Sequence, residues 1–424
     1  MSYEDNISVE NYSNIDDRYL VIPLDYNKEG DGYYVGNRYL NEYYLIPEEG
    51  VQLLIKLTEC GALSKLYEDK SIILDNASVL EFIDEMVAIG FVYKSECEAL
   101  YHDVIANIYK IDKALSPSKL EMFLTKYLYI RWSIFAYCVV GCVTCYELWN
   151  NPKLRPRSTD LFFPHDLSAH LIVLLLLGFI VAMAHECAHL FAARRAGVAT
   201  TMGFGNRMWH LVALVDMSGL WSISRPKRYL PLMAGMLSDG LIFCLSTIFL
   251  NFAIKFKISL FLESTLYALQ FQILLGVAWQ FSVFMKTDVY FILCNFFQNP
   301  NLEKNSLTLY KKMISGIWEN NIPVSEWIAS CKTNLPSLIY GAFWVFGRIW
   351  ALYTLVFLIL PILYKYFTLS ISVVRDSRHS LYEKADAIVF VVLCLSPIIV
   401  GMFLWIKNSI RREHDEYLRA SVQK

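Results

Sequence analysis

The stretch that decides the fold of this chain of 424 residues is Leu167-Ser-Ala-His-Leu-Ile-Val-Leu-Leu-Leu-Leu-Gly-Phe-Ile-Val-Ala-Met-Ala-His185-Glu186-Cys-Ala-His189-Leu-Phe-Ala-Ala-Arg-Arg195. Its apolar part is long enough for a helix that crosses a hydrocarbon core, which needs about 20 residues. Near its end stand two histidines and a glutamate, which are costly in a membrane helix unless they are paired or ligated. The stretch therefore predicts a transmembrane helix that carries a functional site.

The rest of the chain has the composition of a membrane protein, because 55% of its residues are apolar and only 18% are charged. Further long apolar runs are Tyr127 to Leu148, Tyr229 to Phe252, Leu266 to Phe297, Leu338 to Phe367 and Ala387 to Ile406. Together with the quoted stretch they predict an α-helical polytopic membrane protein of about six spans. A net charge of -2 gives no reason to expect a nucleic acid as partner.

The fourth run, Leu266 to Phe297, is too long for a single straight span. About 32 helical residues would extend roughly 48 Å, whereas the hydrocarbon core is about 30 Å thick. The run must therefore tilt, kink or break. A break is tolerated at membrane depth only where the backbone is buried in protein or faces a water-filled cavity, so this run is expected to line a site.

Basic residues predict the orientation of the spans. They gather between spans two and three and again after span six: Arg194, Arg195, Arg207, Arg225, Lys227 and Arg228, then Lys407, Arg411 and Arg412. Because short loops rich in Lys and Arg stay in the cytoplasm, we expect a multi-pass protein of the cell membrane with both termini cytoplasmic. The polar, acidic first 17 residues agree, since they do not read as a signal peptide.

The region before about Lys126 has a different pattern. Short β-like runs at Tyr19 to Leu24, Gly32 to Val35 and Glu42 to Ile46 precede two amphipathic helices at Glu48 to Thr58 and Ser78 to Ala88, and a strand at Phe91 to Tyr93. This order predicts a small α+β domain of winged-helix type. We divide the chain into this cytoplasmic domain at 1–120, a membrane core at 121–300, and a cytoplasmic loop with two spans at 301–424.

The histidines of the quoted stretch have the spacing of a zinc site. Residues four apart lie on one face of a helix, so His185 and His189 can reach one Zn²⁺, and Glu186 lies beside them. In such sites the metal lowers the pKa of its water to about 7 and the glutamate acts as general base. The pattern therefore predicts a zinc hydrolase with Glu186 as its catalytic residue. The alternative is that these residue types meet by chance.

A catalytic zinc usually has three protein ligands, and the third must come from another part of the chain. Two aspartates in apolar runs are candidates: Asp288 in the overlong fourth run and Asp239 in the third. Either aspartate could instead be a packing residue paired with Arg131 or Arg348. Spacing alone does not choose between the two candidates.

The segment from His185 to Val198 resembles the active-site helix of the site-2 protease family of intramembrane zinc metalloproteases, and in particular the branch found with modified peptides and bacteriocins. In that family a later Asp-Gly pair supplies the third ligand. Lys286-Thr-Asp288-Val-Tyr-Phe-Ile-Leu293 and Asn299-Pro-Asn-Leu302 are similar to that region, so the resemblance favours Asp288. Val289 stands where the family usually has glycine, and a β-branched residue resists a positive φ.

The N-terminal domain resembles the PqqD-like domains that bind leader peptides. The resemblance implies a sheet edge that pairs with an extended peptide, whose side chains enter pockets. A domain that packs on the membrane part, or that binds another protein, remains the alternative.

Taken together, the resemblances imply an endopeptidase that hydrolyses a peptide precursor, such as a bacteriocin or modified-peptide leader, near the cytoplasmic membrane face. The precursor would extend along a loop such as Met202-Gly-Phe-Gly205. A peptide transporter or a modifying enzyme is a further partner, beside the lipid bilayer. Two alternatives stay open: regulated cleavage of a membrane-bound signalling factor, and a non-proteolytic export or immunity component that retains a metal site, for which Val289 is the main support.

Overall fold

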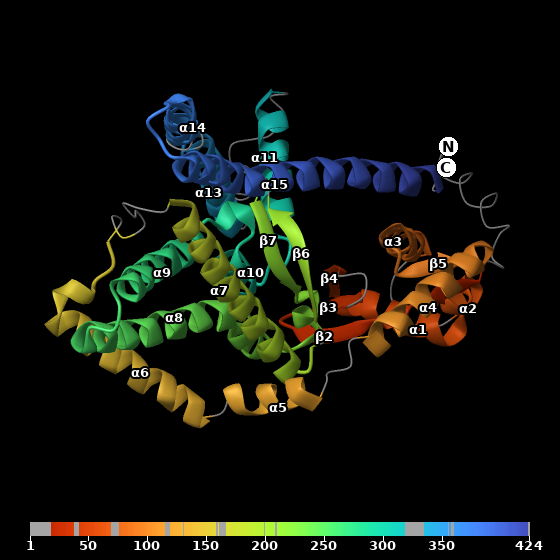
Figure 1. Ribbon diagram of the computed structural model, residues 1–424. Helices are drawn as coiled ribbons and strands as arrows, with labels where there is room; N and C mark the ends of the chain where they lie inside the picture. The colour runs from red at the N-terminus through yellow and green to blue at the C-terminus, as the bar shows by residue number, and fades with distance from the viewer. Residues whose placement is uncertain are drawn as a thin grey trace. The chain divides into compact units, whose positions relative to one another are not determined.

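The computed structural model describes residues 18–37, 42–68, 76–114, 119–129, 131–157, 160, 167–198, 200–207, 210–318, 335–354, 356–357 and 360–422. The described chain is mostly helical and forms two compact units (Figure 1). The first unit contains the described residues up to Met122 together with Ala193–Thr201 and Met217–Arg228. The second contains Phe123–Ala192, Met202–Asp216 and the described residues from Tyr229 onward.

The first unit contains two small antiparallel sheets. In the first sheet β1 (Tyr19–Val21) pairs with β5 (Val92–Lys94), and in the second β3 (Gly32–Asn37) lies between β2 (Asp25–Glu29) and β4 (Glu42–Pro47). The helices are α1 (Glu48–Cys60), α2 (Leu63–Glu68), α3 (Asn76–Ile89) and α4 (Glu98–Ala114). Their apolar faces bury a common core that includes Val35, Leu54, Ile83 and Phe91.

The structure contains the expected small strand region, with one strand that the sequence pattern missed. The strand β2 lies between two of the expected runs, and the turn that follows it is limited to Gly30 and Asp31. Asn27 and Glu29 supply polar groups on one face of this strand, so it lacks the apolar alternation by which strands are identified. The winged-helix type remains a prediction.

The second face of the β2–β3–β4 sheet is covered by residues 218–228 of the same unit. These residues form the short helix η4 (Ser218–Ser222) and the first turn of α8 (Arg225–Phe256). The Asn27 side chain donates hydrogen bonds to the carbonyl oxygens of Trp221 and Ile223, at 3.2 and 3.1 Å. The Trp221 ring lies 5.2 Å from that of Tyr34. The sheet therefore uses this face to pack against the chain's own linker before α8.

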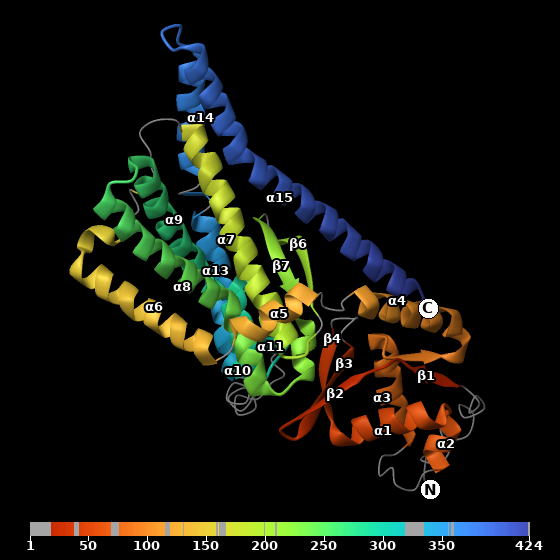
Figure 2. The ribbon, with the colours of Figure 1, turned by 60° about the horizontal axis from the view of Figure 1, so that its bottom comes forward.

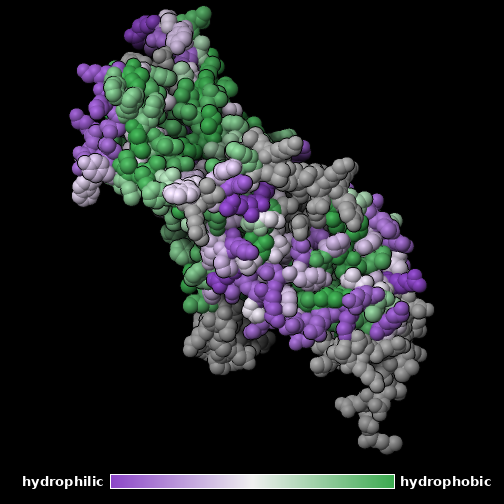
Figure 3. Space-filling view, turned by 90° about the horizontal axis from the view of Figure 1, so that it is seen from below, coloured by the Kyte–Doolittle hydropathy of each residue, from purple (hydrophilic) through white to green (hydrophobic). Residues whose placement is uncertain are grey.

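Six described helices are long and apolar enough to cross a membrane, as the sequence predicted. They are α6 (Arg131–Asn150), α7 (Leu167–Arg195), α8, α9 (Leu260–Trp279), α13 (Leu335–Thr354) and α15 (Leu381–Val422). Helices α6, α8 and α9 lie side by side in the second unit (Figure 2). Hydrophobic side chains cover much of this unit's surface (Figure 3), and Phe179 and Ile180 of α7 are among the exposed ones. A multi-pass membrane protein accounts for this surface.

The overlong fourth run breaks, which confirms one of the expected outcomes. Helix α9 ends at Trp279 and α10 (Asp288–Phe296) begins a new helix. Between them, η5 (Val283–Met285) is followed by Lys286 in the left-handed conformation, with φ of 55°. A straight helix would place Lys286 and Asp288 at membrane depth, where ionisable groups are costly unless they are paired.

The fifth run, expected as one span from Leu338 to Phe367, contains the end of α13 and the start of α14 (Leu360–Arg375), and residues 355, 358 and 359 between them lie outside the described residues. The remaining described elements of this unit are α5 (Lys119–Leu128), the hairpin of β6 (Thr201–Arg207) and β7 (His210–Asp216), and α11 (Leu302–Trp318), which lies in the expected loop.

Candidate metal centre

Three side chains from two helices converge in the second unit. His185 and His189 project from α7 and Asp288 from the first turn of α10. The Nε2 atoms of the two histidines lie 3.1 Å apart. Oδ2 of Asp288 lies 2.9 Å from Nε2 of His185 and 3.0 Å from Nε2 of His189. All three residues are buried, with relative exposures of 7%, 1% and 8%. The structure thus brings together the three residues that the sequence proposed as metal ligands.

The second ring nitrogen of His189 determines what its Nε2 can do. Its Nδ1 lies 2.7 Å from the carbonyl oxygen of Pro231 in α8. A carbonyl oxygen only accepts hydrogen bonds, so Nδ1 must carry a proton and donate it. In the neutral ring Nε2 then presents a lone pair toward the other two residues.

His185 is held in the same way by a carboxylate. Its Nδ1 lies 2.8 Å from Oδ2 of Asp239, also in α8. An ionised carboxylate accepts this hydrogen bond, which places a proton on Nδ1 and, in the neutral ring, leaves the lone pair on Nε2. Asp239, the rival candidate for third ligand, therefore lies on the nitrogen of His185 that faces away from His189, where it orients the ring.

The resulting arrangement fits a divalent cation. With both protons on Nδ1, two imidazole lone pairs and one carboxylate oxygen face one another at about 3 Å, and they would repel without a positive charge between them. Two fully protonated rings with Nε2–H groups 3.1 Å apart would repel as well. In a tetrahedral zinc site with bonds of about 2.0 to 2.1 Å, donor atoms lie about 3.3 Å apart. Two histidines and one carboxylate are also a common ligand set of catalytic zinc.

Gly235 lets α8 pass close to the two imidazole rings. A Cβ on this residue would lie 2.3 Å from Nε2 of His189 and 2.4 Å from Nε2 of His185. No side chain can occupy that position without displacing the rings, so the close approach requires glycine. Sequence reasoning missed this role, although the pair Ala234-Gly235 was visible four residues after Pro231.

Asp288 is positioned by the break in the fourth run. The Thr287 hydroxyl, which is fully buried, donates to the carbonyl oxygen of Gln280 at 2.6 Å. The Asp288 backbone N–H donates to Oε1 of the same glutamine at 3.2 Å. Gln280, at the end of α9, thereby accepts a hydrogen bond from a backbone N–H that has no partner within its own helix. The positive end of the α10 dipole also favours the negative charge of Asp288.

Val289 does not distort this bend. It is the second residue of α10, and the described non-glycine residues with positive φ are Lys257, Lys286 and Gln298. The left-handed residue of the bend is therefore Lys286, two positions before the aspartate. Val289 itself is helical, so this bend does not require a positive φ at the residue after Asp288.

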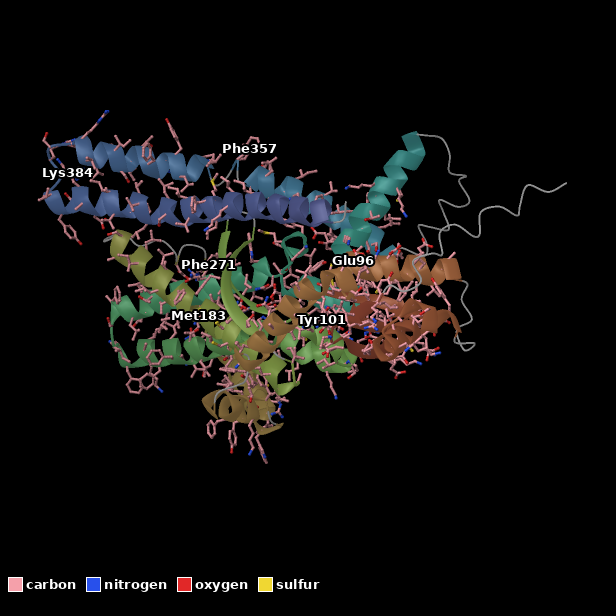
Figure 4. All side chains as sticks on the ribbon, turned by 90° about the vertical axis from the view of Figure 1, so that its right-hand side faces the viewer. Glu96, Tyr101, Met183, Phe271, Phe357 and Lys384 are labelled. Atoms are coloured by element: carbon pink, nitrogen blue, oxygen red, sulfur yellow. The ribbon has the colours of Figure 1, made fainter. Side chains whose placement is uncertain are left out.

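The other residues considered for the site have different surroundings. Glu186 follows His185 on α7 and is half-buried. The guanidinium of Arg348 lies over the Trp344 ring at 4.4 Å, which gives this charge a neighbour other than the two aspartates. The side chain of Arg131 lies outside the described residues. Figure 4 shows the side chains of the unit, with Met183 on α7 two residues before His185.

Comparisons with known proteins add no assignment, since no family model, no curated protein and no solved structure matches the chain. The resemblance to site-2 proteases therefore remains a prediction from short motifs.

Proposed function

We propose that the protein is a membrane-embedded zinc metalloendopeptidase. The observation that carries the proposal is the convergence of three potential metal-binding atoms, two of which belong to histidine rings that are hydrogen-bonded through their other nitrogen, Nδ1. The hydrogen bonds of His189 to Pro231 and of His185 to Asp239 direct both Nε2 lone pairs toward Asp288. Such buried partners of ligand histidines orient the rings and strengthen metal binding.

The residues have distinct roles in this proposal. His185, His189 and Asp288 would hold the ion. A bound zinc ion would polarise a scissile carbonyl and acidify a water molecule. Glu186 would act as general base, taking a proton from the attacking water and passing it to the leaving amine. A site that only stabilised the fold would not need this glutamate.

In this proposal a substrate peptide pairs as an extended strand with the edge of β6. Among the described strands β6 pairs only with β7, and the Phe204 side chain on β6 is 65% exposed. An unpaired strand edge offers backbone groups to an incoming peptide. The loop expected at Met202 to Gly205 is thus a strand, which supports the proposal that a precursor peptide is the substrate.

The test is to co-express the protein with the small peptides encoded beside it and to compare wild type with Glu186→Gln and Asp288→Ala. We expect mass spectrometry to detect cleaved peptide with wild type and none with either variant, while Glu263→Gln in α9 cleaves normally. Zinc content should be retained in Glu186→Gln and lost in Asp288→Ala. Processing that survives Glu186→Gln would exclude the peptidase, and zinc lost in Asp239→Ala but kept in Asp288→Ala would reassign the third ligand.

A non-proteolytic export or immunity component with a structural metal is the second candidate. Its main support was Val289, and the helical conformation of that residue removes the reason to expect a damaged site. Zinc binding without any Glu186-dependent cleavage would favour this candidate. Cleavage of a membrane-bound signalling factor would use the same residues, and differs only in the substrate that co-expression identifies.

A further inference from the structure

Glu303, in the first turn of α11, lies outside the metal centre and yet contacts the chain on both sides of its third ligand. Its side chain is only 15% exposed. One carboxylate oxygen, Oε2, forms an ion pair with Nζ of Lys286, two residues before Asp288. The backbone N–H of Glu303 donates to the hydroxyl of Tyr290, two residues after Asp288, at 3.3 Å. The ligand is thus flanked by two contacts with one residue.

The contact with Lys286 bears on backbone conformation. Lys286 has φ of 55° and ψ of 48°, a region that residues other than glycine, asparagine and aspartate adopt only when the surroundings require it. This turn ends η5 and directs the chain into α10. Because Asp288 is the first residue of α10, the conformation of Lys286 determines where the ligand carboxylate points. The ion pair with Glu303 restrains the side chain of this residue.

Helix α13 contacts Glu303 and also the residues of the bend before and after Asp288. Nε1 of Trp344 donates to Oε1 of Glu303 at 2.9 Å, so each carboxylate oxygen has its own partner. The Tyr340 ring lies 5.3 Å from that of Tyr290. A Cβ on Gly347 would lie 2.2 Å from the Phe284 ring, which shows how closely α13 packs against η5. The described part of the C-terminal region therefore includes a scaffold for the bend.

We propose that Glu303 is a positioning residue for the metal ligand Asp288, acting through its ion pair with Lys286; this inference depends on the metal site proposed above. Trp344 fixes the Glu303 carboxylate, the carboxylate holds Lys286 in its left-handed turn, and the turn presents Asp288 to the two histidines. Residues that orient a ligand in this way typically change metal affinity by 10- to 100-fold when they are replaced.

The experiment measures metal binding by the full chain in detergent, without reference to cleavage. Zinc affinity of wild type, Lys286→Met, Glu303→Gln and the double variant is measured by competition with a chromophoric chelator. The absorption spectrum of the Co²⁺-loaded protein reports the ligand geometry. Glu303→Gln keeps the acceptor for Trp344 and removes only the charge. Lys304→Gln, an exposed lysine next along α11, is the matched control.

We expect each single variant to bind zinc about tenfold more weakly and to show an altered Co²⁺ spectrum, with Lys304→Gln unchanged. The double variant should be no weaker than the singles, because both remove the same ion pair. A double variant that binds zinc about 100-fold more weakly than wild type would overturn the proposed route. Single variants that both keep the zinc affinity and the Co²⁺ spectrum of wild type would overturn it as well. If Lys286→Met fails to fold, Trp344→Phe replaces it and is expected to weaken zinc binding in the same direction.

The two proposals fail in distinguishable ways. A wild-type protein that binds no zinc would overturn the proposed function and this inference with it. A wild-type protein that binds zinc tightly, with Glu303→Gln equally tight, would overturn the inference alone.

Discussion

At the residue scale, the candidate metal centre depends on three residues that are not among its potential ligands. Pro231 offers a backbone oxygen, Asp239 a carboxylate and Gly235 an absence of side chain, and all three lie on α8. Together they set the protonation and the position of the two histidine rings. The Oδ1 atom of Asp239 is buried without a hydrogen-bond partner among the described residues. A buried, unsatisfied oxygen is tolerated where function requires it.

The substitution Gly235→Ala tests this close packing. Alanine favours helices by about 1 kcal/mol over glycine, so helix propensity alone predicts a more stable protein. We expect the reverse for the metal site, because the new Cβ would lie 2.3 Å from Nε2 of His189. Metal analysis of the purified variant should show zinc content reduced by at least about tenfold.

The control for this variant is Gly240→Ala on the same helix, where a Cβ would meet nothing within 4 Å. It should keep its zinc and unfold at the same temperature or slightly higher. Full zinc occupancy in Gly235→Ala would show that α8 is not in contact with the rings in solution.

At the element scale, the break between α9 and α10 places Asp288 in the first turn of a new helix, beside His185 and His189. Gln280 bonds to both Thr287 and Asp288 across the break. The broken helix is possible only because these groups satisfy one another, since lipid offers no hydrogen bonds. The break thus contributes the carboxylate of the candidate metal centre, whereas a continuous helix would only span the membrane.

The variants Gln280→Ala and Thr287→Val each remove hydrogen bonds at the break. Each should lower the free energy of unfolding by roughly 1 to 3 kcal/mol, because a buried partner is left unsatisfied. Thermal unfolding in detergent measures the loss, and zinc affinity should fall in parallel. Ser282→Ala is the matched control, since this residue precedes η5 without a side-chain capping bond. Equal unfolding temperatures for all four proteins would contradict this account.

At the scale of the whole molecule, the chain forms two units, and the first includes residues far apart in sequence. Arg228 is 1% exposed and forms an ion pair of 2.6 Å with Glu29. Its Nε donates to the carbonyl oxygens of Leu220 and Ile223 at 3.1 and 2.8 Å, and the guanidinium lies over the Trp221 ring at 4.7 Å. The N-terminal domain is therefore completed by a segment almost 200 residues away.

Replacing Arg228 by alanine removes the ion pair with Glu29 and the hydrogen bonds to these carbonyl oxygens. Loss of one member of a buried ion pair typically costs 3 to 5 kcal/mol, so we expect about 3 kcal/mol of lost stability in the first unit. Limited proteolysis followed by mass spectrometry should show new cleavage between β2 and β4. Lys227→Ala, an exposed neighbour, should leave the digestion pattern unchanged. An unaltered pattern in Arg228→Ala would mean that the segment does not stabilise the sheet.

The sequence by itself determined the features that arise from local physics. Apolar runs of sufficient length predicted six spans, the excess length of one run predicted the break, and the spacing of His185 and His189 placed both imidazoles on one helix face. Each of these follows from helix geometry and from the thickness of a bilayer. The strand β2 was missed because its polar residues are satisfied by a distant segment, which no local pattern can show.

Only the tertiary structure places Asp288, rather than Asp239, in one candidate metal-binding group with both histidines. Both aspartates contact His185, but one meets Nε2, beside His189, and the other meets Nδ1. Which nitrogen a carboxylate reaches depends on how α8 and α10 pack against α7, and contacts between distant segments are not encoded in residue spacing. The same reason applies to Gly235, Gln280 and Glu303, whose roles arise from neighbours that are remote in the chain.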